Sequence, residues 1–413
     1  MTVTRRPLRI LMVSAHYPPV LNGYAIQCAD TSDMLARRGH DVLVLTGQAR
    51  AATSPQGARC AAVFGNAQPE GRVNLRPGAL ASLVRRRALY RRNARRAASE
   101  AAVFRPDVAL VWQFDSVGIG VALALQTRQI PVAYNVEDYS LATVVRLLAG
   151  RPSPARAVRR WMYGVEPARL DLSCLMLVSG ELRALYAADG FANDAMTVVH
   201  NGLPSSQLAP TPPAPGPGTR LLYVGRLHPT KGVSLAIEAV AHANHRCNEA
   251  LTLDVIGTGE ADYVARLEAL ARSEGLSASV RFLGHCDRDA IFALYDQYDA
   301  LLFPSTWVEP FGLAVIEAMA RGVPVIALEQ GGPKEIITHM TDGLLVPVAS
   351  PEAFGDAIAC LAGNAPLRHE LGAAAIRKVE RCFTVERQAD RTEAVLQDMV
   401  DRHRADRGQG RRA

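Results

Sequence analysis

Two glutamates, Glu309 and Glu317, stand eight positions apart in EPFGLAVIE, with an aromatic residue and a glycine between them and an apolar helical run behind. If a helix begins near Gly312, the two carboxylates lie at most about 12 Å apart at roughly 1.5 Å per residue. This span suits a sugar at one carboxylate and a ribose at the other. The first helical turn, from Gly312 to Val315, offers free backbone N–H groups for a phosphate between them.

Two glutamates at arbitrary spacing are more often solvated acids, so the surrounding motifs decide whether this pair forms a site. The loop GRLHPTKG places Arg226 just after a predicted strand and Lys231 five positions later, near the start of a helix. Two cations there can neutralise a diphosphate, and arginine can bind its oxygens in bidentate fashion. A solvated pair at a strand end explains this loop equally well.

Three glycine-containing loops also follow predicted strands, where ligands of parallel α/β sheets bind. Gly23 in SAHYPPVLNGYA begins a predicted helix, and Gly257 in IGTGE begins a loop over which a base could lie, although each is compatible with a simple turn. The diglycine Gly331–Gly332 in EQGGPKEII is expected to leave backbone exposed opposite the acidic helix.

Short apolar, β-branched runs alternate with longer helical patterns along the chain, which predicts buried parallel strands in α/β domains. The expected strands are residues 8–13, 41–46, 107–112 and 130–136, then a strand beginning at 220 and strands at 251–257, 279–284, 299–305, 323–328 and 343–348. Proline and glycine dominate PTPPAPGPGT at 210–219, which predicts a stiff linker between two doubly wound sheets with a cleft between them.

Composition agrees with two globular domains. The chain has 413 residues, 49% hydrophobic and 21% charged, with a net charge of +6. No apolar stretch is long enough to span a membrane. The basic start followed by LRILMVSA imitates a signal peptide, but the apolar run is short, and we interpret it as a first strand of a cytoplasmic protein. Seven scattered cysteines without a C-x-x-C pair favour free thiols and make a structural metal unlikely.

Taken together, GRLHPTKG, EPFGLAVIEAMARGVPVIAL and GGPKEII, in this order, resemble the motifs of family 4 glycosyltransferases, and the resemblance covers nearly the whole chain. It implies the α/β GT-B fold, with two Rossmann-like domains facing each other across a cleft. The expected divisions are an acceptor-side domain at 1–204, a linker at 205–219, a nucleotide-sugar domain at 220–384, a helix at 385–403 that packs back on the first domain, and a tail at 404–413.

The resemblance also implies roles for individual residues. Glu309 would contact the donor sugar, Glu317 the ribose, and Arg226 with Lys231 the diphosphate. The remaining positions expected to bind the donor are Gly23, Asn201, Gly225, Gly257, Pro310, Phe311, Gly312 and Leu313. The implied reaction retains the anomeric configuration and needs neither a metal nor a cofactor, because the two cations and the helix N-terminus would stabilise the leaving diphosphate.

One position departs from the family pattern. A histidine usually follows the strand that matches IPVAYNV, whereas this chain continues YNVEDYS. Depending on register, the histidine aligns with Tyr134 or with Glu137. Tyr134 could donate a hydrogen bond to a sugar hydroxyl, and Glu137 could accept one or act as a base. Asn135 together with Glu137 favours the Tyr134 register slightly.

Eight arginines and no acid lie between Arg76 and Arg96, where Leu80, Leu83, Val84 and Leu89 could form the apolar face of a helix. Such a helix suits an anionic membrane surface, which would place the protein at the inner membrane face and fit a lipid-linked acceptor. A glycan or a small molecule is an alternative acceptor, and a solvated basic helix is the simpler interpretation of the segment. Nucleic-acid binding fits less well, because aromatic residues are sparse there.

Two other functions remain open at this stage. An epimerase of the same fold would bind a similar donor without an acceptor, and a non-catalytic nucleotide-sugar-binding protein would explain the missing histidine. The two glutamates together with GRLHPTKG argue against the epimerase, and turnover that depends on Glu309 would exclude the binding protein.

Overall fold

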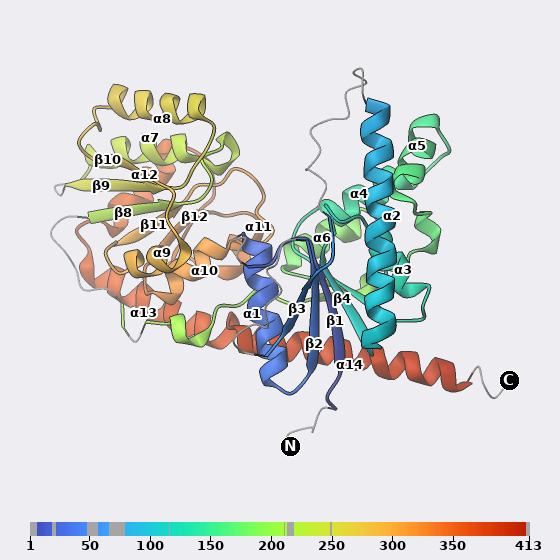
Figure 1. Ribbon diagram of the computed structural model, residues 1–413. Coiled ribbons are helices and arrows are strands. Elements are labelled where there is room, and N and C mark those ends of the chain that lie inside the picture. The colour runs from blue at the N-terminus through green and yellow to red at the C-terminus, as the bar shows by residue number, and fades with distance from the viewer. Residues whose placement is uncertain are drawn as a thin grey trace. The chain divides into compact units, whose positions relative to one another are not determined.

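The computed structural model describes residues 6–18, 22–47, 57–65, 79–114, 116–209, 211–212, 219–247 and 250–409. These residues form two compact units, one made of 1–200 with 385–413 and the other of 201–384 (Figure 1). The sequence placed the domain change at 204 and a linker at 205–219. Residues 210 and 213–218 of that linker lie outside the described part, and Ser205–Gln207 form a 3₁₀ turn within the second unit.

The N-terminal unit is a parallel sheet in the order β3-β2-β1-β4-β5-β6-β7 with helices on its faces. Its strands are β1 (Arg9–Ser14), β2 (Asp41–Thr46), β3 (Arg59–Ala62), β4 (Val108–Gln113), β5 (Val132–Val136), β6 (Leu175–Leu177) and β7 (Met196–Val198). Its helices are α1 (Gly23–Arg37), α2 (Ala79–Phe104), α3 (Gly120–Gln126), α4 (Ser140–Leu148), α5 (Pro154–Tyr163), α6 (Gly180–Ala188) and α14 (Val385–Gln409). The four strands predicted from apolar runs are confirmed, whereas the short strands β3, β6 and β7 were not predicted.

The C-terminal unit is a second parallel sheet, in the order β10-β9-β8-β11-β12-β13. Its strands are β8 (Thr219–Val224), β9 (Leu251–Ile256), β10 (Val280–Gly284), β11 (Ala300–Phe303), β12 (Val325–Leu328) and β13 (Leu344–Val346). Its helices are α7 (Val233–Asn244), α8 (Ala261–Ser273), α9 (Arg288–Tyr295), α10 (Leu313–Ala320), α11 (Gly331–Ile336), α12 (Pro351–Leu361) and α13 (Ala365–Cys382). All six strands predicted for this part of the chain are confirmed.

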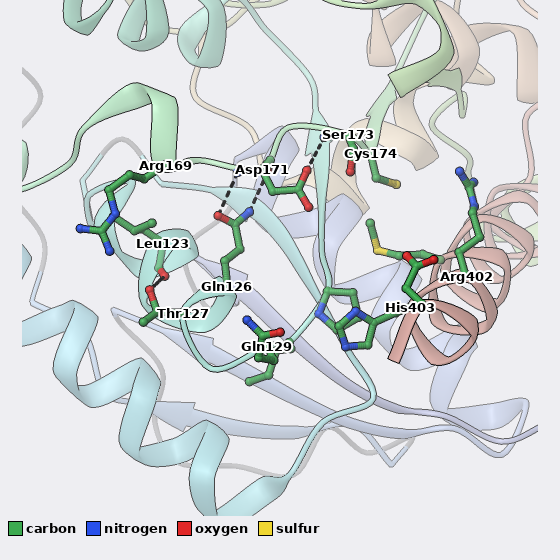
Figure 2. Close-up of a pocket in the computed structure, with 14 residues that line it drawn as sticks. Leu123, Gln126, Thr127, Gln129, Arg169, Asp171, Ser173, Cys174, Arg402 and His403 are labelled. Carbon is green, nitrogen blue, oxygen red and sulfur yellow. Dashed lines mark hydrogen bonds between the residues drawn. The ribbon is translucent and has the colours of Figure 1, made fainter. Parts of the chain in front are cut away.

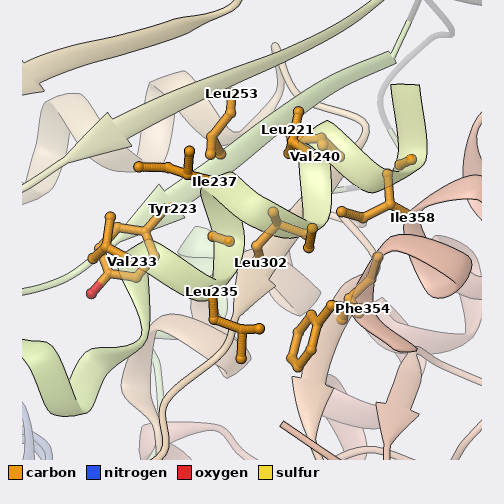
Figure 3. Close-up of a cluster of buried hydrophobic side chains, with 14 of the residues drawn as sticks. Leu221, Tyr223, Val233, Leu235, Ile237, Val240, Leu253, Leu302, Phe354 and Ile358 are labelled. Carbon is orange, nitrogen blue, oxygen red and sulfur yellow. The ribbon is translucent and has the colours of Figure 1, made fainter. Parts of the chain in front are cut away.

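The core of the C-terminal unit is organised around α7, which packs against both the sheet and α12 (Figure 3). Ile237 and Val240 of α7 are fully buried, as are Leu253 of β9 and Leu302 of β11. Each such side chain contributes about 1.5–3 kcal/mol by leaving water. This apolar layer holds the strands rigidly, so the loops at their carboxyl ends have fixed starting points.

Helix α14 belongs to the N-terminal unit, although it is the last element of the chain. Its Ala389, Leu396 and Val400 are buried in the same core cluster as β1 and β4. Glu393 of α14 pairs with Arg38 at 3.1 Å and with His40 at 3.4 Å, and its side chain is only 9% exposed. Apolar packing and a buried carboxylate therefore tie this helix to the first sheet.

The diglycine Gly331–Gly332 is buried rather than exposed, so the sequence expectation for it was wrong. The backbone N–H of Gly332 donates to the Glu309 carbonyl at 2.8 Å. A Cβ atom on Gly332 would lie 2.1 Å from the Phe311 carbonyl oxygen, and one on Gly331 would lie 2.5 Å from that of Glu309. The two glycines are required because the backbone at 309–311 packs directly on them. They therefore fix where Glu309 lies.

None of the described helices has a long enough apolar stretch to cross a bilayer.

We expect Glu393→Ala to lower the free energy of unfolding by about 1–3 kcal/mol, because it leaves the ring nitrogen of His40 and the Arg38 guanidinium without a buried partner. Denaturant unfolding measures the loss. Asp390→Ala is the matched control: Asp390 pairs with the same Arg38 at 2.9 Å but is 50% exposed. Its loss should stay within about 1 kcal/mol. Equal effects of the two substitutions would contradict the buried role of Glu393.

Gly332→Ala should destabilise the protein by about 1–3 kcal/mol, since the new methyl group collides with backbone atoms that cannot move aside. Chemical denaturation of both variants gives the comparison with Gly120→Ala, whose Cβ atom would make only ordinary contacts at 3.4 Å. A Gly332→Ala protein as stable as the Gly120→Ala protein would show that the loop at 309–311 can shift.

Candidate active site

The carboxylate of Glu309 lies at the carboxyl end of β11, where polar groups from two loops meet. Its Oε1 accepts a hydrogen bond from Ser305 Oγ at 2.8 Å and forms an ion pair with Lys231 Nζ. The side chains of Lys231 and Glu309 are 19% and 13% exposed. The structure thus brings together two residues that are 78 positions apart, and the carboxylate is held in place rather than freely solvated.

Helix α10 starts directly after this carboxylate. Gly312 is its N-cap with φ of 109°, a backbone conformation that glycine adopts without steric cost. The helix itself begins at Leu313, as expected. The N–H of Val315 already donates to the Gly312 carbonyl at 3.0 Å, so the predicted set of free N–H groups up to Val315 was too large. Only the positions before Val315 remain available to an anion.

Glu317 lies on α10 and is 9% exposed, so it is not a solvated helix residue. The hydroxyl of Tyr295, at the end of α9, donates to its Oε2 at 3.5 Å. A buried carboxylate with a hydroxyl partner retains further acceptor capacity for a ligand hydroxyl.

The two cations of the loop GRLHPTKG, Arg226 and Lys231, have different surroundings. Lys231 ends the 3₁₀ turn Pro229–Lys231, and Gly232 separates it from α7. Arg226 is exposed, and its backbone carbonyl accepts a hydrogen bond from Tyr223 Oη at 3.0 Å. The loop therefore directs Lys231 onto Glu309 and leaves the Arg226 guanidinium at the surface.

The other predicted donor-binding residues of the C-terminal unit lie near strand ends. Gly225 follows β8, and its N–H donates to the carbonyl of Ile256, which precedes Gly257. Asn201 is buried at 2% exposure. Phe311 is 4% exposed and contacts the Phe383 ring edge to face, with ring centroids 5.9 Å apart. The half-buried Pro310 and Leu313 flank Phe311 and Gly312 on α10's entry loop.

Three predicted residues belong to the N-terminal unit. Gly23 is the first residue of α1, next to Asn22, whose Oδ1 accepts from the N–H of Ala25 at 2.9 Å. Tyr134, in the middle of β5, is 1% exposed, and its hydroxyl accepts a hydrogen bond from Gln126 Nε2 at 3.1 Å. Burial raises the pKa of that hydroxyl.

Glu137 lies just beyond the carboxyl end of β5, where its Oε1 accepts from Asn135 Nδ2 at 3.1 Å. Tyr134 and Glu137 both line one small hollow. Glu137 therefore lies at the edge of the sheet where ligands of such folds bind, whereas the Tyr134 hydroxyl is occupied by a helix residue.

The sequence analysis missed several polar residues at strand ends. In the C-terminal unit these are Ser305, just after β11, and Gln330, whose Nε2 donates to the Ser305 carbonyl at 2.8 Å. In the N-terminal unit they are His16 after β1 and Gln113 at the end of β4. His16 Nδ1 and Gln113 Oε1 are buried and have no hydrogen-bond partner among the described residues, and burial lowers the pKa of His16. All four lie at or just beyond the carboxyl ends of parallel strands, where ligands of such sheets bind.

Within the described ranges, no cluster of three or more His, Cys, Asp or Glu side chains could hold a metal ion.

The basic segment lies on helix α2, apart from its first part, including Arg76, which is outside the described residues. On α2, Leu80 and Val84 are exposed, at 72% and 48%, whereas Leu83 and Leu89 are half-buried. The expected apolar face is thus only partly presented to solvent.

Comparison with known proteins places this geometry in a family. The model "Glycosyltransferase Family 4" matches residues 21–207, and "Glycosyl transferases group 1" matches 209–378. The chain is 30% identical over 350 residues to a glycogen synthase of Mycobacterium tuberculosis, covering 82% of each chain. It is also 30% identical over 251 residues to a D-inositol 3-phosphate glycosyltransferase of Streptomyces bingchenggensis, which is 59% of this chain and 51% of that protein.

Solved structures show the same fold. A glycosyltransferase from Rickettsia africae aligns with a TM-score of 0.73 at 15% identity, covering 95% of this chain and 99% of that one. The Anabaena protein HepE, solved in complex with UDP and glucose, aligns with a TM-score of 0.69 at 20% identity, covering 94% and 99%. The two parallel sheets with alternating helices are thus the α/β GT-B fold, and the chain belongs to glycosyltransferase family 4.

Proposed function

We propose that this glycosyltransferase transfers a hexose from a nucleoside-diphosphate sugar to an acceptor hydroxyl, with retention of anomeric configuration and without a metal. The observation that carries the proposal is the Glu309 carboxylate, held by Lys231 and Ser305 at the entrance to α10. Glu317 on the same helix supplies a second buried acceptor for hydroxyl groups. The complex of HepE with UDP and glucose supports the choice of donor.

In this proposal each group at the donor end has one task. Glu309 accepts hydrogen bonds from the sugar hydroxyls, and Glu317 accepts them from the ribose. Lys231, Arg226 and the N-terminus of α10 stabilise the charge that grows on the diphosphate as the glycosidic bond breaks. Lys231 has three N–H donors, so it can keep Glu309 while binding a phosphate oxygen. Gly225 and Gly257 lie at adjacent strand ends, where a Cβ atom on Gly257 would lie 1.8 Å from the Gly225 carbonyl oxygen, so two closely packed backbone segments would support the nucleotide there.

The bond changes balance without a separate base. The acceptor oxygen forms a bond to the anomeric carbon while the bond from that carbon to the phosphate oxygen breaks, and the acceptor's proton passes to the departing phosphate oxygen. On the acceptor side we propose that Glu137, rather than Tyr134, takes the place of the family's usual histidine. Its support is position: Glu137 follows β5, whereas the Tyr134 hydroxyl is buried against Gln126. The acceptor would be a glycan, a lipid-linked sugar or a small molecule.

The donor proposal is tested with Glu309→Gln. We expect its kcat to fall about 10²-fold, since a neutral amide cannot support the developing positive charge, while nucleotide affinity stays nearly unchanged. Glu317→Gln should instead weaken nucleoside-diphosphate binding about tenfold, through loss of a charged hydrogen bond. Glu329→Gln removes an exposed acid of a nearby loop and serves as the control. Turnover is followed by nucleotide release from UDP-, GDP- and ADP-sugars, and product configuration by NMR.

Several outcomes would contradict the proposal. A true nucleotide ligand at a hundredfold excess over Kd stabilises the fold by about 2.7 kcal/mol, so the absence of any thermal shift would exclude the donor site. Binding without turnover would favour a non-catalytic binding protein, and release of an epimerised nucleotide sugar would favour an epimerase. Loss of activity in EDTA, restored by a divalent cation, would overturn metal independence.

We further propose that the N-terminal unit of this cytoplasmic protein contacts an anionic membrane through α2 and α5. Neither residues 79–99 nor residues 140–165 contain an acid. Helix α5 contacts α2, and Arg87 of α2 stacks over the Trp161 ring, 4.6 Å from its centroid. Trp161 and Val158 are 42% and 46% exposed on α5, close to exposed arginines. Exposed apolar and aromatic groups among cations suit a lipid interface.

Removing three charges from this surface, by Arg85→Ala, Arg91→Ala and Arg159→Ala together, should abolish most binding to phosphatidylglycerol vesicles. Each arginine near an anionic surface contributes about 1 kcal/mol. Vesicle co-sedimentation measures the effect, and the wild type should not bind phosphatidylcholine vesicles. The control removes exposed Arg266, Arg272 and Arg377 from the C-terminal unit. Equal losses in both variants would show that net charge alone matters, and would contradict a specific surface.

A further inference from the structure

A cavity of about 690 Å³ lies in the N-terminal unit, at the amino ends of β5 and β6 (Figure 2). The end of α3, the loop 127–131, the segment 169–174 and α14 surround it. Its volume falls within the roughly 300–1,000 Å³ that is usual for small-molecule sites. Glu137 lies beyond the other end of β5, roughly 15 Å away at about 3.3 Å per residue. The cavity is therefore separate from the proposed acceptor position.

The walls of the cavity carry both cations and hydrogen-bond acceptors. Arg169 and Arg402 lie on opposite sides, with His403 and Asp171 between them (Figure 2). Asp406 of α14 is a second carboxylate in the lining. Burial raises the pKa of the Cys174 thiol to about 12, so this lining residue adds no charge.

One polar atom at the cavity lacks a partner. His403 Nε2 is buried and makes no hydrogen bond to any residue that the structure describes. Such an atom carries a desolvation cost that a ligand would remove. The neighbouring Arg402 is paired with Asp398, and its planar guanidinium has N–H donors beyond those of one ion pair.

The cavity is also rigidly built. The side-chain amide of Gln126 holds the segment 169–174, donating to the Asp171 carbonyl at 2.7 Å and accepting from the Asp171 N–H at 3.2 Å. Gln129, also in the lining, has φ of 59°, an unfavourable backbone conformation for a non-glycine residue. The N–H of Ile130 donates to the Leu125 carbonyl at 3.3 Å across this residue, which closes the end of α3 and fixes the loop 127–131.

We propose that this cavity binds a phosphorylated saccharide as a second ligand, distinct from the donor. The phosphate would bind Arg402, and a rotation of the His403 ring would bring its buried Nε2 to a phosphate oxygen. The sugar hydroxyls would bind Gln129, Asp171 and Asp406, since amides and carboxylates are good hydroxyl partners. The two carboxylates, Asp171 and Asp406, would repel a ligand that carries several negative charges. The mixture of charges therefore fits a molecule with one anionic group and several hydroxyl groups.

Isothermal titration of the full-length protein with glucose 6-phosphate, mannose 6-phosphate and glucose 1-phosphate tests the site. We expect at least one of them to bind, and both Arg402→Ala and His403→Ala to weaken its Kd about tenfold or more, as loss of a charge-assisted hydrogen bond predicts. Arg128→Ala removes an exposed arginine beside the cavity that is not in its lining, and should bind as the wild type does. An unchanged melting temperature of each variant shows that the fold is intact.

Gln129→Gly provides a second variant that should fold well, because glycine removes the backbone strain while deleting a lining amide. It should weaken sugar-phosphate binding and leave the melting temperature equal or higher. No binding of any of the three probes, or binding that the variants of Arg402, His403 and Gln129 all leave unchanged, would overturn the proposal. Inorganic phosphate binding as tightly as the sugar phosphates would overturn the assignment to a saccharide. Because the readout is binding alone, this result is independent of whether the proposed transfer reaction is correct.

Discussion

The proposed donor site depends on how the Glu309 carboxylate is held. A carboxylate in a partly dehydrated loop is costly unless it is paired and hydrogen-bonded. Here Lys231 supplies a positive charge and Ser305 a hydroxyl donor to the carboxylate, while the backbone N–H of Gly332 donates to the Glu309 carbonyl. Three segments from different βα units must therefore be in register for one side chain to be stable. The sheet from which these segments emerge is held rigid by the packing of α7 and α12 against it, which makes that register possible.

The same loop also explains why small residues occur where they do. Gly312 has a left-handed backbone that turns the chain from Glu309 into α10, and the diglycine admits the backbone at 309–311 at contact distance. These glycines shape the backbone of the loop. Their effect is to place the N-terminus of α10 and the Glu309 carboxylate side by side, so that both can act on one anionic, hydroxylated molecule.

In the N-terminal unit, the two ends of the parallel strands have different surroundings. The carboxyl ends of β1, β4 and β5 bring His16, Gln113 and Glu137 to neighbouring positions, because these three strands are adjacent in the sheet. At the amino ends of β5 and β6, α14 from the far end of the chain forms one wall of a cavity. Tyr134 of β5 accepts a hydrogen bond from the Gln126 side chain, which also holds one wall of that cavity, so β5 runs from the cavity to Glu137.

The sequence by itself determined the α/β class, all six strands of the second sheet and the family, because buried parallel strands are continuous apolar runs and the family's motifs are contiguous. It did not predict β3 and β7, whose residues RCAA and MTV form no continuous apolar run, nor β6, although its residues LML are apolar. Only the tertiary structure decided that Lys231 pairs with Glu309, that Gly331–Gly332 is buried and that the Tyr134 hydroxyl binds Gln126. The first two depend on contacts between residues that are distant in the chain, and the third on how α3 packs beside β5, which local pattern and propensity do not encode.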